Sequence, residues 1–326
     1  MPETVGERPE LSVVIPAFNE AGNVAPMYER LVAALDGQVS GLEIVFIDDG
    51  SVDETWRGVV ELAQRDGRVR GVRFARNFGH QAALTAGVDA ARGRAVVIID
   101  ADLQDPPEVI PQMVEKWRAG HEVVYGQRAE REGETWFKKT TAAIFYRTLR
   151  AITNVDIPVD TGDFRLMGPR AVAAFRALPE RNRFIRGLVS WIGFPQTAVQ
   201  YQRHARHTGE TKYPLRKMTR FALDGITSFS FLPLRLATVA GFTVSLLSFL
   251  YIVVVIILKV LGINWPGYTS MMASILFLGG VQLVMIGVLG EYVARVFDEV
   301  KRRPLYLVGE STDESVEVTP PERPAS

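Results

Sequence analysis

Short apolar runs alternate with longer amphipathic stretches up to residue 128 of the chain. The apolar runs predict strands at residues 11–17, 42–47, 69–74, 96–99 and 123–126, because they are short and rich in β-branched side chains. The amphipathic stretches predict helices near residues 21–35, 53–65, 81–91 and 107–119. Strands and helices that alternate at this spacing are typical of a mostly parallel sheet with helices on both faces. This part of the chain is therefore expected to have an α/β fold.

One of these strands ends in a cluster of oxygen-bearing side chains. Asp100, Asp102 and Gln104 follow the apolar run directly. Open α/β sheets bind ligands beyond the carboxyl ends of their strands, and oxygen ligands suit hard cations such as Mg²⁺ or Mn²⁺. A strand end with a capping aspartate, before a helix that begins with Pro107, explains the same residues without a metal. The D-x-D pattern alone leaves both interpretations open.

Further acidic residues lie at the expected carboxyl ends of two other strands. Glu20 follows the first strand, and Asp48 and Asp49 follow the second. Each position has a local explanation as a turn or a helix cap. Taken together with the D-x-D pattern, they predict a pocket for a nucleotide diphosphate. In that pocket carboxylates would bind the base and ribose, and metal-bound oxygens would bind the pyrophosphate.

Two long stretches near the C-terminus lack charged residues. They cover residues 236–258 and 260–290, and a polar turn with Trp265 and Tyr268 interrupts the second. Because about 20 apolar residues span a bilayer core, a pair of transmembrane helices is favoured over two buried helices of a soluble domain. Basic residues lie on the outer flanks and not in the turn, which predicts that both termini and the N-terminal domain are cytoplasmic. Two spans offer no evident transport path and are interpreted as an anchor.

Two segments between the expected sheet and the anchor are basic. Residues 136–152 predict an amphipathic helix that either lies on a membrane surface or packs on the sheet. Residues 216–234 are expected to form a juxtamembrane interfacial segment. The other expected divisions are a disordered N-terminus at 1–10, a cytoplasmic catalytic domain at 11–215, a transmembrane anchor at 235–297, and a cytoplasmic, largely disordered tail at 298–326.

Composition excludes several classes of function. The formal net charge is zero, so no overall electrostatic field favours nucleic acid as a partner. The chain has no cysteine, which excludes disulfides, thiolate metal sites and cysteine nucleophiles. The polar first ten residues lack the apolar core of a cleavable signal peptide. His80 and His121 have no partner at metal-ligand spacing, and we expect both to be structural.

A set of ordered motifs narrows the interpretation. The motifs are VVIPAFNE (13–20), FIDDGSVDET (46–55), RNFGHQAALTAG (76–87), IDADLQDPPE (99–108), DTGDFRLM (160–167), RFIRGLVSWIGF (183–194) and HTGETKYPLRKM (207–218). In this order they resemble family-2 glycosyltransferases with the GT-A nucleotide-sugar fold. More narrowly, the chain resembles the polyisoprenyl-phosphate glycosyltransferases, which include bacterial undecaprenyl-phosphate sugar transferases and dolichyl-phosphate mannose synthases. The resemblance covers residues 11–304. The chain departs from the family's G-x-S-K-Y motif at one position, where Thr211 replaces the usual serine and keeps a hydroxyl group.

The resemblance implies a role for each motif. Nucleotide-sugar binding is implied for Pro16, Phe18, Glu20, Asp49, Arg76 and Asp100, and metal binding for Asp100, Asp102 and Gln104. Catalytic roles are implied for Asp163, Arg128, Arg165 and Lys212, and lipid-phosphate binding for Arg183, Arg186 and Lys212. A lipid phosphate arrives already ionised, so cations that hold it matter more than a strong base. Asp163 is expected nearest the reacting sugar.

The sequence therefore predicts a metal-dependent, inverting transferase that uses Mg²⁺ or Mn²⁺. It would move one sugar from a nucleotide donor, with UDP-glucose favoured over GDP-mannose and modified UDP-sugars, to an undecaprenyl or dolichyl phosphate at the cytoplasmic membrane face. Membrane lipid is a further expected partner, nucleic acid is not one, and a homo-oligomer rests on the resemblance alone. Two alternatives remain open. A processive polysaccharide synthase usually has a Q-x-x-R-W motif and more spans than this chain shows, and a membrane scaffold with a vestigial nucleotide-sugar domain would not be an enzyme.

Overall fold

The structure of the protein is a computed structural model, which describes residues 8–128, 161–181, 183–202, 232–262, 267–313 and 316. Lys212, the predicted helix at 136–152 and residues 216–231 of the juxtamembrane segment predicted at 216–234 lie outside the described residues. The chain divides into two units, an α/β unit and a helical hairpin, and each is described by itself.

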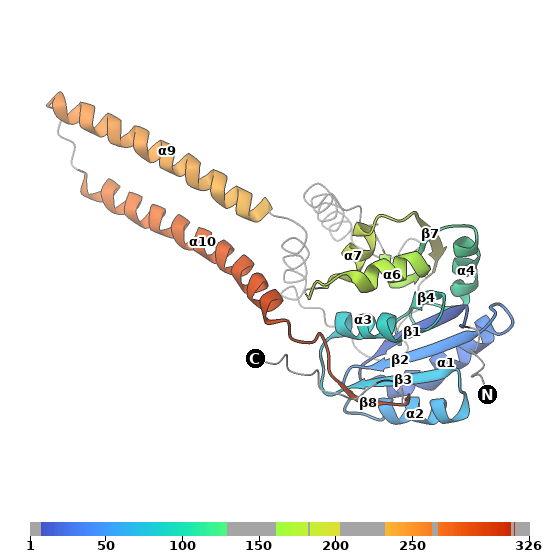
Figure 1. The fold of residues 1–326 in the computed structure, drawn as a ribbon. Coiled ribbons are helices and arrows are strands. Elements are labelled where there is room, and N and C mark those ends of the chain that lie inside the picture. Colours follow the sequence, from blue (N-terminus) through green and yellow to red (C-terminus); the bar gives the residue numbers. More distant parts are fainter. Residues whose placement is uncertain are drawn as a thin grey trace. The chain divides into compact units, whose positions relative to one another are not determined.

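An eight-stranded sheet forms the centre of the α/β unit (Figure 1). The strands lie in the order β7–β5–β6–β4–β1–β2–β3–β8. Their bounds are β1 (Leu11–Ala17), β2 (Leu42–Asp48), β3 (Val69–Phe74), β4 (Ala95–Ile98), β5 (Val123–Arg128), β6 (Thr161–Met167), β7 (Gln196–Tyr201) and β8 (Val308–Ser311). The helices are α1 (Ala21–Leu35), α2 (Thr55–Arg65), α3 (His80–Ala90), a 3₁₀ turn (Pro107–Val109), α4 (Ile110–Arg118), α6 (Pro169–Ala177) and α7 (Ile185–Trp191).

Strand direction brings several loops to one edge of this sheet. β1 pairs in parallel with β2 and β4, and β2 pairs in parallel with β3. β6 is antiparallel to both of its neighbours, β4 and β5, whereas β5 and β7 are parallel. The carboxyl ends of β1 to β4 therefore meet the amino end of β6 at the same edge. We call it the carboxyl edge.

Helices cover both faces of the sheet because successive side chains of a strand point to opposite sides. Val13 of β1 packs in a core cluster with Met27 of α1 and Val59 of α2. Its neighbour Val14 faces α3 on the other side of the sheet (Figure 1). A β-carbon at Gly87 of α3 would lie 2.0 Å from the Val14 side chain, so only glycine allows α3 to pack this closely on β1.

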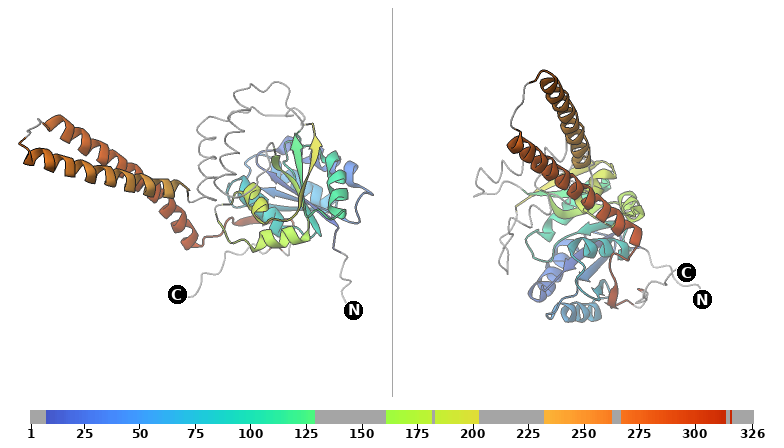
Figure 2. Two further views of the ribbon diagram at one scale, coloured as in Figure 1. Left: turned by 90° about the horizontal axis from the view of Figure 1, so that it is seen from above. Right: turned by 90° about the vertical axis from the view of Figure 1, so that its left-hand side faces the viewer.

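The second unit is a hairpin of two long apolar helices, α9 (Leu232–Val260) and α10 (Tyr268–Lys301). The two helices contact each other, and Figure 2 shows them joined as one hairpin. The stretches Leu234–Val260 and Ser270–Lys301 have mean hydropathies of 2.6 and 2.2, and both are long and apolar enough to cross a membrane. At about 1.5 Å per residue, each exceeds the roughly 30 Å of a bilayer core. The predicted pair of apolar helices is confirmed, and they extend beyond the predicted bounds 235–297 at both ends.

The strands and helices predicted for residues 11–128 are confirmed, with ends that differ by only a few residues. The predicted disorder of the two ends is wrong in part. An acidic, proline-containing composition predicts disorder from residue 298 onward, but α10 continues to Lys301 and β8 adds an antiparallel strand to β3. Glu10, expected in a disordered N-terminus, is buried and accepts hydrogen bonds from Ser40 and Arg118. Both corrections have one physical reason, which is pairing with distant partners that composition does not reveal.

Candidate active site

The loops after β1 and β2 bind each other at the carboxyl edge. The backbone N–H of Asn19 donates to the Ser51 hydroxyl at 2.9 Å, and the N–H of Val52 donates to the Asn19 side-chain oxygen at 3.0 Å. Asn19 has a φ of 55°, a left-handed conformation that asparagine tolerates better than most residues. The ring of Phe18, next to it, is 45% exposed. The two loops thus form one wall with an aromatic face open to a ligand.

Asp49 organises a third loop, the one that follows β3. Its buried carboxylate accepts hydrogen bonds from the backbone N–H groups of Phe78, at 2.7 Å, and Gly79, at 3.0 Å. Burial raises the pKa of Asp49, and these two N–H groups oppose the shift. Next to it, Gly50 has a φ of 70°, and a β-carbon there would lie 2.6 Å from the Arg76 carbonyl carbon. The glycine therefore lets the third loop, residues 75–79, pack directly on the second.

Asp100 and Asp163 come from adjacent antiparallel strands. Ile98 of β4 pairs with Arg165 of β6, and two residues further toward the carboxyl edge the chains reach Asp100 and Asp163. His80, the first residue of α3, lies between their carboxylates. Its Nε2 is 3.3 Å from Asp163 Oδ2 and 3.6 Å from Asp100 Oδ1. The ring is 44% exposed on its side chain, so this bridge borders solvent.

Arg186 of α7 pairs with Asp163. Its Nε donates to Oδ1 at 2.9 Å and its Nη2 donates to Oδ2 at 3.1 Å, while the Asp163 side chain is only 5% exposed. Burial by itself would raise the pKa of Asp163, but Arg186, His80 and Arg165 together hold it well below its usual range. Asp163 is therefore a carboxylate at neutral pH and a weak proton acceptor.

Asp100 has the opposite electrostatic environment. Burial raises the pKa of Asp100 to about 6; His80 opposes this shift, whereas Asp163, Asp105 and Asp102 add to it. Its Oδ1 is buried and accepts no hydrogen bond from any residue that the structure describes. A buried carboxylate oxygen without a donor, among other carboxylates, is stabilised by a cation.

Asp102 and Gln104 lie directly after Asp100 on the same loop. Leu103 between them has a φ of 58°, and this left-handed turn brings the Gln104 N–H to 3.2 Å from Asp102 Oδ1. Within the described ranges, no three His, Asp or Glu side chains gather as a metal site of their own. Mg²⁺ is usually held by one or two carboxylates together with substrate phosphates. Asp100 and Asp102 would fit a divalent cation that is held in this way.

Arg128 borders the site on the β5 side. Its Nε donates to the Tyr201 hydroxyl at 3.4 Å, and its Nη2 lies 3.9 Å from Asp105 Oδ1. The Tyr201 hydroxyl in turn donates to Asp105. A β-carbon at Gly162 would lie 2.9 Å from the Arg128 guanidinium, which therefore covers the backbone next to Asp163.

Two other arginines of the predicted set are bound within the fold. Arg165 is buried and donates to the carbonyl oxygens of Gly162 at 3.0 Å and Asp163 at 3.3 Å. Burial lowers the pKa of Arg165 to about 10, so it remains a cation at neutral pH. Arg183 donates to two carbonyl oxygens of residues 178–180, at 2.6 and 3.0 Å. These contacts give both arginines a supporting position. The catalytic role predicted for Arg165 and the phosphate contact predicted for Arg183 stay predictions.

The structure thus brings part of the predicted set together: Asp100, Asp163 and Arg186 meet around His80. Pro16 lies in β1 opposite Ile47, and the Glu20 carboxylate accepts a hydrogen bond from Asn23. Sequence reasoning missed His80, for which it predicted a structural role. The position of His80 in the sequence could have identified it. It follows the loop at the carboxyl end of β3, and the same kind of position, just after a strand, identified Asp100.

Comparison with known proteins gives matches over both units. The model described as Glycosyl transferase family 2 matches residues 12–174, and the model described as GtrB C-terminal hairpin matches residues 232–296. "Uncharacterized glycosyltransferase YkcC" of Bacillus subtilis is 49% identical over 303 residues, which cover 93% of this chain and 94% of that protein. "SfII prophage-derived bactoprenol glucosyl transferase" of Shigella flexneri is 45% identical over 303 residues, which cover 93% of this chain and 98% of that protein.

A solved structure is similar at a much lower level. Glucosyl-3-phosphoglycerate synthase from Mycobacterium tuberculosis, in complex with Mn²⁺, UDP-glucose and phosphoglyceric acid, is 18% identical with a TM-score of 0.46. The similarity covers 66% of this chain and 76% of that chain. The range matched by the family model, by contrast, includes Asp100, Asp102 and Asp163. The predicted GT-A α/β fold with two apolar C-terminal helices is confirmed, and the chain belongs to glycosyltransferase family 2.

Proposed function

We propose that this chain transfers one glucose from UDP-glucose to undecaprenyl phosphate, with its helical hairpin as a membrane anchor. One observation carries the proposal: Asp100, with a buried oxygen that lacks a donor among the described residues, lies beside the Asp163–Arg186 pair, with His80 between them. Asp100, which would help to bind a cation for the departing diphosphate, thus lies close to Arg186, which would bind the ionised acceptor phosphate. The bactoprenol glucosyl transferase from Shigella flexneri, 45% identical over nearly its whole length, supports this donor sugar and acceptor lipid.

The reaction exchanges one bond of the sugar for another. An oxygen of the lipid phosphate forms a bond to the anomeric carbon, while the bond from that carbon to the diphosphate breaks. UDP leaves with the bonding electron pair, and attack from the opposite face inverts the anomeric configuration. Asp100 and Asp102 would hold a Mg²⁺ or Mn²⁺ ion, which supplies positive charge to the departing diphosphate.

Asp163 is suited to positioning and not to removing a proton. Because its pKa is held low, it is a weak base, and an ionised phosphate needs no base. Its carboxylate instead binds the Nε–Nη2 edge of Arg186 and so fixes the plane of the guanidinium, whose positive charge would attract the acceptor phosphate. We assign Arg186 and Arg128 to the acceptor phosphate, together with Lys212 from the stretch outside the described residues.

The donor nucleotide would lie against the wall formed by the loops after β1, β2 and β3. Phe18 offers an exposed ring there. The guanidinium of Arg76 stacks 4.1 Å from the Phe78 ring centroid, and both belong to loop 75–79. A stacked guanidinium is preorganised for a phosphate, since less side-chain freedom remains to be lost on binding.

The direct test uses the purified full chain in detergent or lipid nanodiscs. It is incubated with Mg²⁺ or Mn²⁺, undecaprenyl phosphate and radiolabelled UDP-glucose, and the organic phase is then analysed for a lipid-linked glucose. A parallel reaction that contains EDTA in place of the divalent cation serves as the inactive control. Absence of lipid product with UDP-glucose, GDP-mannose and the other common UDP-sugars would contradict the proposal, and long glycan products would favour a processive synthase.

We also propose that both ends of the chain and the α/β unit face the cytoplasm. Arg235 lies near the start of α9, and Lys301 ends α10, so basic residues flank the hairpin at its open end. The chain has no cysteine, so a single Gly267→Cys substitution can be labelled without background. An impermeant maleimide should label this cysteine from outside intact cells, and labelling only after lysis would reverse the orientation.

A further inference from the structure

The chain returns to the sheet after the helical hairpin. Residues 306–313, here called the C-terminal strap, follow α10 by a short connection and include β8, which pairs antiparallel with β3. The N–H of Thr312 donates to the Gly71 carbonyl oxygen at 3.0 Å, and the N–H of Gly71 donates to the Thr312 hydroxyl at 2.8 Å. The strap thereby covers what would otherwise be an open edge of the sheet.

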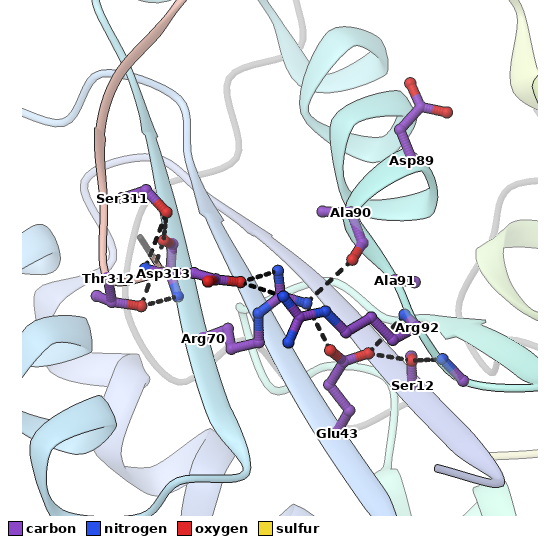
Figure 3. Close-up of polar contacts among 12 residues, drawn as sticks. Ser12, Glu43, Arg70, Asp89, Ala90, Ala91, Arg92, Ser311, Thr312 and Asp313 are labelled. Atoms are coloured by element: carbon purple, nitrogen blue, oxygen red, sulfur yellow. Dashed lines mark hydrogen bonds and ion pairs between the residues drawn. The ribbon is translucent and has the colours of Figure 1, made fainter. Parts of the chain in front are cut away.

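Charge pairs fix the far end of the strap. Asp313 Oδ2 lies 2.5 Å from Arg70 Nη2 and 2.6 Å from Arg92 Nη2. Figure 3 shows the three side chains together. Arg70 is held from its other side by Glu43 at 2.6 Å. The Asp313 and Arg70 side chains are largely buried, so this network is screened less by salt than a surface pair. The strap is therefore a firmly attached part of the α/β unit.

The near end of the strap lies against the start of loop 75–79. The ring of Tyr306 stacks on that of Phe74 with centroids 4.9 Å apart, and its hydroxyl donates to Asp89 of α3 at 3.4 Å. The Ala75 N–H donates to the carbonyl oxygen of strap residue Leu307 at 2.9 Å. Tyr306 thus contacts both the residue before the loop and the helix after it.

Loop 75–79 is held between the strap and the loop that carries Asp49. A β-carbon at strap residue Gly309 would lie 3.1 Å from Ala75 Cα, which shows how close the two backbones are. On the other side, the Phe78 N–H donates to Asp49, and the Phe78 ring meets Phe74 edge-on at 5.7 Å. A continuous row of rings therefore runs from Tyr306 through Phe74 to Phe78.

We propose that Tyr306 is a positioning residue, which holds loop 75–79 in the shape that binds the nucleotide sugar. Phe74 is buried and cannot move independently of the ring that stacks on it. Loss of the Tyr306 ring frees Phe74 to turn, which loosens Phe78 and its hydrogen bond to Asp49. The segment that returns from the membrane hairpin thereby becomes part of the donor site.

Hydrogen exchange of the full chain in detergent tests the proposal without any substrate. In Tyr306→Ala, the peptide that covers residues 75–80 should exchange about tenfold faster than in the wild type, the upper range expected for an aromatic pair. Tyr306→Phe keeps the ring and should leave exchange unchanged. Thr312→Val removes a hydrogen bond at the far end of the strap and is the matched control, with exchange at 75–80 unchanged.

Exchange in β1 reports whether each variant is folded. The proposal would be overturned if, in Tyr306→Ala, β1 stays protected and the exchange of residues 75–80 is unchanged. It would also be overturned if Thr312→Val accelerates the exchange of residues 75–80 as much as Tyr306→Ala does. If Tyr306→Ala also exposes β1, Tyr306→Leu replaces it, with the same expected acceleration at 75–80.

The kinetic consequence rests on the proposed function. Tyr306→Ala should raise the KM for UDP-glucose about tenfold and leave the KM for undecaprenyl phosphate unchanged, with Tyr306→Phe restoring the wild-type value. Equal rises in both KM values would overturn the assignment to the donor side. A wild-type chain that forms no lipid-linked sugar would contradict the proposed function, whereas the exchange experiment would still decide the role of Tyr306.

Discussion

Arg186 binds the carboxylate of Asp163 through two parallel hydrogen bonds, Nε to Oδ1 at 2.9 Å and Nη2 to Oδ2 at 3.1 Å. Arg186→Lys keeps the positive charge but provides only a point donor in place of the planar fork. We expect kcat for lipid-linked transfer to fall about 10- to 100-fold, since one charge-assisted hydrogen bond contributes about 1.5–3 kcal/mol. Steady-state assays with UDP-glucose and undecaprenyl phosphate measure the change.

Arg57→Lys is the matched control for this substitution. Arg57 lies on α2, is 74% exposed, and pairs only with the surface residues Glu54 and Glu61 in its described contacts. Such exposed pairs contribute little, so kcat should stay at the wild-type value. A wild-type kcat in Arg186→Lys itself would show that the paired geometry at Asp163 is not required.

The composition of the carboxyl edge could be predicted because parallel α/β sheets place the ends of their strands together. Glu20, Asp49 and Asp100 each follow an apolar run, and each lies where that rule puts it. That Asp100 and Asp163 lie close together, on either side of His80, could not be predicted in the same way. It depends on β6 entering antiparallel between β4 and β5, a choice of neighbour that no local periodicity encodes.

The C-terminal strap shows why composition can mislead. Its acidic residues suggest a solvated tail. In the structure Glu310 pairs with Arg73 at 2.6 Å, and Asp313 pairs with Arg70. Complementary charges far apart in sequence therefore order a segment that has few apolar residues of its own.

His80 supplies a second prediction, because its ring connects the donor and acceptor sides of the site. His80→Leu removes the nitrogen that lies 3.3 Å from Asp163 Oδ2 and 3.6 Å from Asp100 Oδ1. We expect kcat/KM to fall at least tenfold, about the effect of losing one hydrogen bond to a charged group. His80→Gln places an amide donor near the same point and should recover part of the loss.

Thermal unfolding distinguishes this effect from a loss of fold. His80 begins α3 at a partly exposed position, so both variants should melt within a few degrees of the wild type. Equal activity of His80→Leu and His80→Gln would argue that the ring fills space and does not orient the carboxylates.

Metal dependence gives a third prediction. Chelation with EDTA should abolish transfer, and Mg²⁺ or Mn²⁺ should restore it. Asp102→Asn removes a carboxylate from the loop that follows Asp100, so the metal concentration for half-maximal activity should rise about 10- to 100-fold. Metal titration of the activity measures this shift.

Glu108→Gln is the control for the metal titration. Glu108 carries the same charge a few residues further on, but its carboxylate pairs with Arg30 of α1 at 2.7 Å and is 55% exposed. Its substitution should leave the metal requirement unchanged. Full activity of the wild type after exhaustive chelation would contradict the assignment of Asp100 and Asp102 to a cation.

The last prediction concerns stability against acid at the end of α2. Arg68 donates to both oxygens of Asp66, and the Tyr28 hydroxyl donates to Oδ2 at 2.8 Å. The hydrogen bonds from Arg68, more than any other contact, lower the pKa of Asp66 from 3.8 to about 2. A carboxyl whose pKa is lower in the folded state stabilises the fold above its unfolded pKa, and the contribution disappears as pH falls through the folded value. Asp66→Asn should therefore lower the melting temperature by a constant few degrees between about pH 7 and pH 5. That difference should shrink below about pH 4 and approach zero near pH 2.

Asp36→Asn is the control for this prediction. Asp36 is 75% exposed and lies 3.6 Å from Arg68, so its substitution should change the melting temperature little at any pH. Tryptophan-fluorescence melting of the full chain measures both variants, and a difference for Asp66→Asn that persists undiminished at pH 3 would contradict the role assigned to Arg68.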